Sequence, residues 1–68
     1  MDDLKLCWSI IAEYHDRDEV FHLRDNTVYA ESIGEAIEIV DGWLADGMEV
    51  DGWSDYHIIG ANIVPELH

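Results

Sequence analysis

The chain has 68 residues, 49% of them hydrophobic, and sixteen acidic residues against three lysines and arginines give it a formal net charge of −13. A chain of this length forms one small domain, residues 1–68, and its apolar content excludes wholesale disorder. The acidic excess disfavours direct contact with nucleic acid or an anionic membrane, which leaves basic proteins as partners.

Cysteine usage and the N-terminus indicate a compartment. Cys7 is the only cysteine, so neither an intramolecular disulfide nor a cysteine-rich zinc site can form. The first residues lack the basic leader and apolar run of a signal peptide, and no segment reaches the roughly 20 apolar residues of a membrane span. We therefore expect a cytoplasmic protein.

Residues 4–14 alternate with a period of two, which predicts a strand. The residues expected on its core face are Leu4, Leu6, Trp8, Ile10, Ala12 and Tyr14. The polar run from residue 15 to residue 19 interrupts this alternation and predicts a turn.

Residues 20–31 are predicted to form two short antiparallel strands. The pair Asp25-Asn26 at their centre tolerates positive φ and suits a two-residue hairpin turn. Pairing outward from this turn places four apolar side chains on one face, which are Phe21, Leu23, Val28 and Ala30.

Residues 32–47 predict one amphipathic helix. Ser32 and Glu35 have the spacing of a capping box, in which Glu35 reaches back to the Ser32 amide. The expected core stripe is Ile33, Ile37, Val40 and Leu44, flanked by Ala36 and Trp43. Gly47 is expected to end the helix in the left-handed conformation, with Met48 contacting Trp43 as in a Schellman motif.

Residues 49–55 read as a loop with room for a small hairpin, and residues 56–64 as the last strand, which ends at Pro65. One face of that strand is expected to hold His57, Ile59, Ala61 and Ile63, and the other Tyr56, Ile58, Asn62 and Val64. Gly60 is expected to mark a bulge. The predicted fold class is α+β, an antiparallel sheet in the order β-β-β-α-β with one helix packed on one face.

Metal and catalytic motifs are absent from the sequence. A calcium loop aligned on Glu49, Asp51 and Gly52 would need an acid where Ile58 stands. Three of the histidines, His15, His22 and His57, lie on different predicted elements without zinc-ligand spacing. The alternative is that His22 and His57 are half-buried strand residues and that His15 lies in a turn. With no nucleophile elbow and no phosphate-binding glycine loop, we expect no enzyme activity, metal or cofactor.

Acidic residues gather in three clusters: one, Asp16, Asp18 and Glu19, lies at the predicted turn, and the other two are candidates for binding a partner. The first of these two groups, along the predicted helix, is Glu31, Glu35, Glu38 and Asp41. The second, around the helix exit, is Asp46, Glu49, Asp51 and Asp55. Neighbours in the first group lie about 5–6 Å apart, a spacing comparable to that of phosphates along a nucleic-acid strand. The groups therefore predict either a mimic of DNA charge or an ordinary solvated face.

Trp53 lies in a polar, glycine-containing loop with no periodic position. An exposed tryptophan among acidic residues is typical of an interface anchor, so Trp53 joins the candidate partner-binding residues. The alternative is that Trp53 folds back and caps the small core.

Two resemblances bear on function. The segment from Val28 to Ser32, followed by Glu35-Ala36-Ile37, resembles the strand-to-helix junction of HicB-type antitoxins over about residues 4–47. This resemblance implies a module that masks a small basic toxin.

The short chain, its single α/β unit, its lack of catalytic motifs and its clustered acids resemble small acidic anti-CRISPR proteins of phages and mobile elements, several of which imitate DNA. This second resemblance implies a host-cell inhibitor whose partner is a Cas effector complex. We expect a non-enzymatic inhibitor of a basic nucleic-acid-binding protein, acting as a monomer or a homodimer through exposed strand edges.

Overall fold

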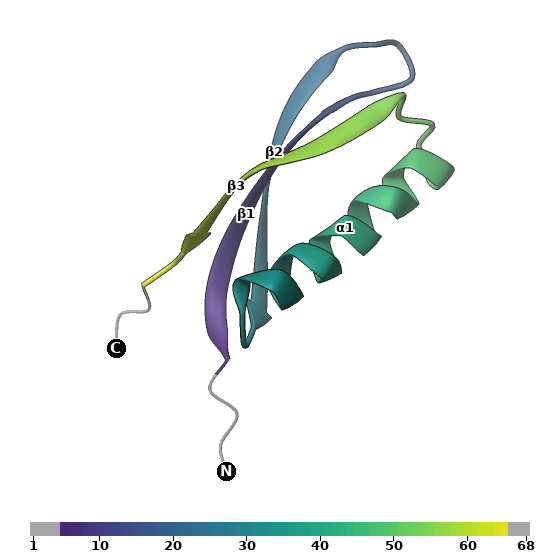
Figure 1. Cartoon of the computed structure of the whole chain (residues 1–68). Helices are drawn as coiled ribbons and strands as arrows, with labels where there is room; N and C mark the ends of the chain where they lie inside the picture. The colour runs from purple at the N-terminus through teal and green to yellow at the C-terminus, as the bar shows by residue number, and fades with distance from the viewer. Residues whose placement is uncertain (1–4, 66–68) are drawn as a thin grey trace.

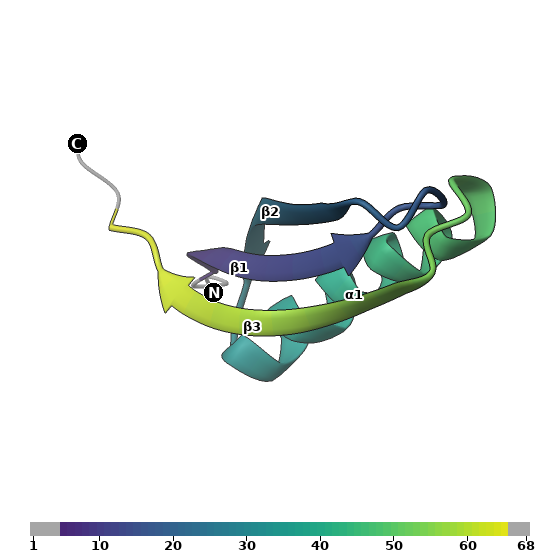
Figure 2. The same cartoon turned by 90° about the horizontal axis from the view of Figure 1, so that it is seen from above.

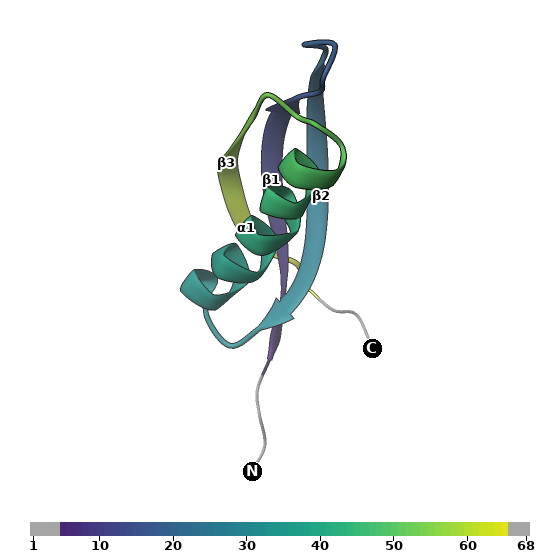
Figure 3. The same cartoon turned by 90° about the vertical axis from the view of Figure 1, so that its right-hand side faces the viewer.

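The computed structural model describes residues 5–65, and Figure 1 shows their arrangement. The elements are β1 (Leu6–His15), β2 (Phe21–Ala30), α1 (Ile33–Val50) and β3 (Asp55–Ile63). The strands form one antiparallel sheet in the order β2-β1-β3, and α1 packs on one of its faces (Figures 1 and 3). The predicted α+β class with one helix on an antiparallel sheet is confirmed, and the element order is β-β-α-β.

β1 is the central strand, and its alternation is as predicted. Trp8, Ile10 and Ala12 are buried beneath α1, and Tyr14 packs against the same core. Leu6 is 43% exposed at the strand end, and Leu4 lies outside the described residues. Because α1 covers only one face of the sheet, alternate residues of β1 are apolar and buried while the residues between them face the other side.

The predicted hairpin turn at Asp25-Asn26 is wrong, because both residues lie inside one continuous strand. β2 pairs with β1 without interruption from Phe21 to Ala30. Asn26 is buried, and its amide donates a hydrogen bond to the Ile10 carbonyl oxygen at 3.1 Å. Its polar group is thus satisfied inside the sheet, and the local turn preference of the pair is overridden by pairing with β1.

The chain turns between β1 and β2, at residues 16–20, which confirms the turn predicted from the polar run at residues 15–19 to within one residue. One carboxylate oxygen of Asp16 accepts hydrogen bonds from the backbone N–H of Asp18 and Val20, at 2.8 and 2.9 Å. Glu19 takes the left-handed conformation, with φ of 65°. An aspartate that bonds its own following backbone is a common way to stabilise a turn.

Because β2 continues through Asp25-Asn26 without a turn, its side chains lie on other faces than predicted. Val28 and Ala30 are buried against α1, whereas Phe21 is 50% and Leu23 is 63% exposed on the other side of the sheet. The prediction that all four share one face is therefore wrong. Without a turn inside β2, residues of odd and even number must lie on opposite faces.

α1 begins as predicted and ends later. The Ser32 hydroxyl accepts a hydrogen bond from the Glu35 N–H at 3.2 Å, but the Glu35 carboxylate accepts from the Glu31 N–H rather than from the Ser32 N–H. Gly47 does not end the helix. It lies inside α1, and the left-handed residue beyond the helix is Gly52, with φ of 74°. Since the helix does not end at Gly47, the Schellman contact predicted there does not arise.

The buried stripe of α1 is rotated relative to the prediction. Its buried residues are Ala36, Val40, Leu44 and Gly47. Ile33 is 47% and Trp43 is 44% exposed. Small residues at both ends of the stripe let the helix lie close to the sheet and to the Trp53 ring.

β3 contains the bulge expected near Gly60. Ile11 pairs with Gly60 while Ala12 pairs with Ile58, so Ile59 is the extra residue. The bulge switches the faces of the strand, since Tyr56 and Ile58 pack on the core before it and Ala61 does so after it. The predicted uninterrupted alternation along residues 56–64 is therefore wrong. Residues 51–54 connect α1 to β3 without a hairpin.

Candidate interaction surface

Three kinds of site are missing from the described part of the chain. Residues 5–65 contain no group of three or more histidine, cysteine or acidic side chains placed to hold a metal ion. The same residues enclose no pocket. Within them, α1 is not apolar enough to cross a membrane. The search for a functional site therefore turns to the surface.

The outward side of α1 carries a row of carboxylates that we call the acidic ridge. Its members, all exposed, are Glu35, Glu38, Asp41, Asp46 and Glu49. α1 contains no lysine, arginine or histidine. α1 lies along one face of the sheet (Figure 2). Its small and branched apolar residues belong to the core between helix and sheet, so the opposite, acidic side of the helix faces away from the strands.

The ridge repeats along the helix axis. Glu35 and Glu38 are followed eleven residues later by Asp46 and Glu49. Eleven residues make about three turns and about 16 Å, so the two pairs project from the same side. From Glu35 to Glu49 the ridge places five carboxylates along about 21 Å of helix. One strand of duplex DNA carries about six phosphates over that length, so the charge densities are similar.

Two members of the ridge also have structural roles. Glu35 accepts the Glu31 N–H at 2.7 Å, and Asp41 accepts the Tyr56 hydroxyl at 2.8 Å. The hydrogen bond to Asp41 raises the pKa of Tyr56 above its usual value.

The other three members are Glu38, Asp46 and Glu49. Within residues 5–65 they form no hydrogen bond and no ion pair, so their charge is fully available to a partner.

None of the three basic residues pairs with a carboxylate of the ridge, although one of them reaches the C-cap residue beyond it. Arg17, in the turn before β2, directs its Nε to the Asp51 carbonyl oxygen at 3.3 Å. Arg24, on β2, lies 6.0 Å from the centre of the Trp53 ring system. Lys5 is exposed just before β1. None of them neutralises the outer side of α1, because none forms an ion pair with an acid of the described residues.

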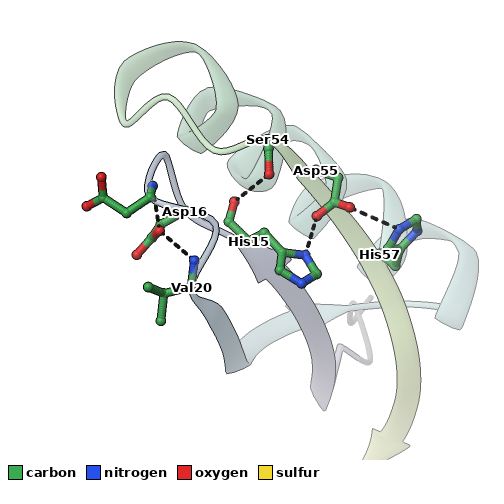
Figure 4. A network of polar contacts seen from close by, with 7 residues as sticks. His15, Asp16, Val20, Ser54, Asp55 and His57 are labelled. Atoms are coloured by element: carbon green, nitrogen blue, oxygen red, sulfur yellow. Dashed lines mark hydrogen bonds and ion pairs between the residues drawn. The ribbon is translucent and has the colours of Figure 1, made fainter.

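The remaining predicted acids do not join the ridge. Glu31 precedes the helix cap and Asp51 is the C-cap residue, so both flank the ridge at its ends. Asp55 lies on the other side of the molecule, at the start of β3, where it bonds His15 Nδ1 at 2.9 Å (Figure 4). The first acidic group is thus largely assembled as predicted, and the second is divided between two faces.

Trp53 is a core residue, which is the second of the two alternatives raised by the sequence. It is 8% exposed, and its ring stacks on Tyr14 with a centroid separation of 3.8 Å. A Cβ atom on Gly47 would lie 2.5 Å from the same ring. Trp53 therefore covers the end of the core and offers little surface to a partner.

A histidine-carboxylate cluster that sequence reasoning did not predict lies on the face of the sheet opposite α1. Asp55 lies between His15 and His57, with its two oxygens 2.9 and 3.9 Å from their ring nitrogens (Figure 4). The hydrogen bond to Asp55 raises the pKa of His15, and the same bond lowers the pKa of Asp55. Only the pairing of β1 with β3 brings these residues together, so no local spacing could have indicated them.

A second pair, Asp16 and His22, closes the β1–β2 turn with an Oδ2 to Nε2 distance of 2.9 Å. The hydrogen bond from His22 lowers the pKa of Asp16, with further lowering from the backbone N–H of Val20. The His22 ring also stacks on Tyr14, with ring centres 4.9 Å apart. Both contacts indicate a structural role for His22.

Comparison with known proteins finds no relative. No protein-family model matches the chain, and neither the curated proteins nor the solved structures contain a match to it.

Proposed function

We propose that this chain is a non-enzymatic inhibitor that occupies the phosphate-binding surface of a basic nucleic-acid-binding protein. Following the resemblance to small acidic anti-CRISPR proteins, we propose that the target is the DNA-binding channel of a Cas effector complex. The observation that carries the proposal is the acidic ridge, five exposed carboxylates on one helix without an intervening cation.

Electrostatics would drive this association. A single-sign surface speeds the encounter with an oppositely charged groove, and its carboxylates take the places of DNA phosphates beside lysine and arginine. Binding releases the salt ions that surround the ridge and the basic groove of the partner. The affinity should therefore fall steeply as the salt concentration is raised. The backbone of a helix is already ordered before binding, so little conformational entropy is lost when the partner binds.

The test is competition for DNA. Purified guide-loaded Cas effector complexes are mixed with labelled target duplex and increasing amounts of the chain, at 50 and 200 mM salt. We expect the chain to displace DNA, with an apparent affinity that falls by more than about tenfold between the two salt concentrations. An affinity that does not change with salt would contradict the proposal.

Two triple variants with equal net charge locate the contact. Glu38→Gln, Asp46→Asn and Glu49→Gln remove the three unpaired charges of the ridge, and the control removes three charges elsewhere through Glu13→Gln, Asp18→Asn and Glu19→Gln. We expect the ridge triple to weaken inhibition about tenfold or more, and the control to change it less than about threefold. Equal loss in both variants would show that total charge, not the ridge, governs binding.

A second candidate function is a HicB-like antitoxin module that masks a small basic toxin. The uncovered side of the sheet favours it, because Phe21, Leu23 and Ile59 are each at least half exposed there or at the bulge of β3. Such binding would depend on apolar contacts and tolerate salt. It would also survive the ridge triple, which separates the two functions in the same experiment.

A further inference from the structure

β2 is an edge strand with backbone groups directed outward. The Cys7 and His15 carbonyl oxygens accept hydrogen bonds from the Val64 and Ser54 N–H groups on the β3 side. Odd-numbered residues of β1 therefore point their backbone groups at β3, and even-numbered residues point theirs at β2.

The register of the sheet pairs even residues of β1 with even residues of β2. The odd residues of β2 consequently direct N–H and C=O away from the sheet. Three of these lie at the centre of the strand, namely Leu23, Asp25 and Thr27. β2 lies along one side of the sheet and α1 packs on a face rather than on this edge (Figure 3).

The two edges of the sheet are not alike. β3 is interrupted by the bulge at Ile59 and Gly60, a feature that discourages pairing with a further strand. β2 runs for ten residues without a bulge, a proline or a lysine. Of the two edge strands, β2 is therefore the one whose regular backbone can pair with another strand.

Charge indicates which strand β2 accepts. The segment from Phe21 to Ala30 contains one arginine and one aspartate, so its formal charge is zero in a chain whose net charge is −13. The strand therefore brings no net charge of its own to a pairing with a second copy, and the residues of the acidic ridge belong to α1 rather than to this strand. We propose that two copies pair β2 with β2 in antiparallel orientation about a two-fold axis, forming a continuous six-stranded sheet with both helices on one face.

The side chains favour one of the three registers whose axis passes through the middle of β2, at Arg24, Asp25 or Asn26. An axis through Arg24 or Asp25 would place like charges opposite each other, which is unfavourable. An axis through Asn26 places Asp25 opposite Thr27 of the second copy and Leu23 opposite Tyr29 of the second copy, each twice. Leu23 is 63% and Tyr29 is 56% exposed in the single chain, so both gain contact area in this register.

Sedimentation velocity over a range of protein concentrations tests the proposal, at 150 and 500 mM salt. We expect the mass to change from 7.8 kDa to twice that value as concentration rises. Dimer formation should strengthen at high salt, because the two copies carry the same charge. This direction is opposite to that expected for the basic partner, so the two proposals stand or fall separately. A mass that stays monomeric under every condition would overturn the dimer.

Matched substitutions identify the edge. Leu23→Lys places a lysine on β2 at each side of the axis and should raise the dimer dissociation constant about tenfold or more. Ile59→Lys, at a residue 54% exposed on the other edge strand, should leave the dissociation constant unchanged. A dimer that is lost in Ile59→Lys and retained in Leu23→Lys would mean that the other edge pairs.

Amide hydrogen exchange of the unmodified chain keeps the test independent of variant folding. The N–H groups of Leu23, Asp25 and Thr27 should become protected as protein concentration rises, and those of residues bonded to β1 should change little. Protection of the β3 edge instead, or no concentration dependence in a confirmed dimer, would overturn the assignment.

Discussion

Two glycines of α1 illustrate how differently one residue type is used. Gly42 faces open space, and a Cβ atom there meets nothing within 4 Å. Gly47 is buried, and the ring of Trp53 that covers it is held in turn by stacking on Tyr14. The first glycine only weakens the helix, whereas the second is required by the packing of the core.

Alanine substitutions should therefore act in opposite directions. Gly42→Ala is expected to raise the free energy of unfolding by about 0.5–1 kcal/mol through helix propensity. Gly47→Ala is expected to lower it by about 1–3 kcal/mol, because the Trp53 ring cannot move aside without losing Tyr14. Urea unfolding followed by tryptophan fluorescence measures both. Stabilisation by both substitutions would mean that the ring yields easily.

The N-terminal end of α1 could be predicted from the sequence, whereas its C-terminal end could not. The N-terminal cap depends on residues three apart in the chain, so Ser32 and Glu35 indicated it directly. Ser32→Ala should cost about 1 kcal/mol of stability, and Ser32→Asn should restore most of it, because asparagine is as good an N-cap. Thermal unfolding by circular dichroism checks the pair. A stability unchanged in Ser32→Ala would show that the hydroxyl cap contributes little.

The C-terminal end could not be predicted in the same way. Gly47 has the local signature of a helix stop, but its use is set by Trp53, which arrives from the following loop. The turn at Asp25-Asn26 failed for the same reason, since Asn26 finds its partner on β1. The alternation of β1, the Ser32 hydroxyl cap and the bulge near Gly60 are local and were predicted correctly. The faces of β2 and the cluster around Asp55 depend on pairing between strands, and sequence periodicity does not report that pairing.

At the scale of the whole molecule, the charges fall into two arrangements. On α1 the acids of the ridge form no ion pair, whereas Asp16 in the β1–β2 turn and Asp55 on β3 bond histidines. The helix row was predictable from 3.6-residue periodicity, but the histidine pairs were not. The first arrangement suits a partner of opposite charge, and the second makes the stability of the fold depend on pH.

Stability should be greatest at mildly acidic pH. The raised pKa of His15 adds stability that is fully present below its ordinary pKa of 6.5 and is lost as pH rises through the raised value. The lowered pKa values of Asp16 and Asp55 add stability that is present above 3.8 and is lost as pH falls through the lowered values.

Melting temperatures measured from pH 3 to pH 9 should therefore pass through a maximum between about pH 4 and pH 6.5. His15→Gln should flatten the decline on the alkaline side, because the protonated imidazole that Asp55 stabilises is gone. High salt should raise the melting temperature most at pH 8, where self-repulsion is greatest. A melting temperature that climbs steadily toward pH 9 would mean that the carboxylate-histidine contacts on the sheet do not govern the stability of this fold.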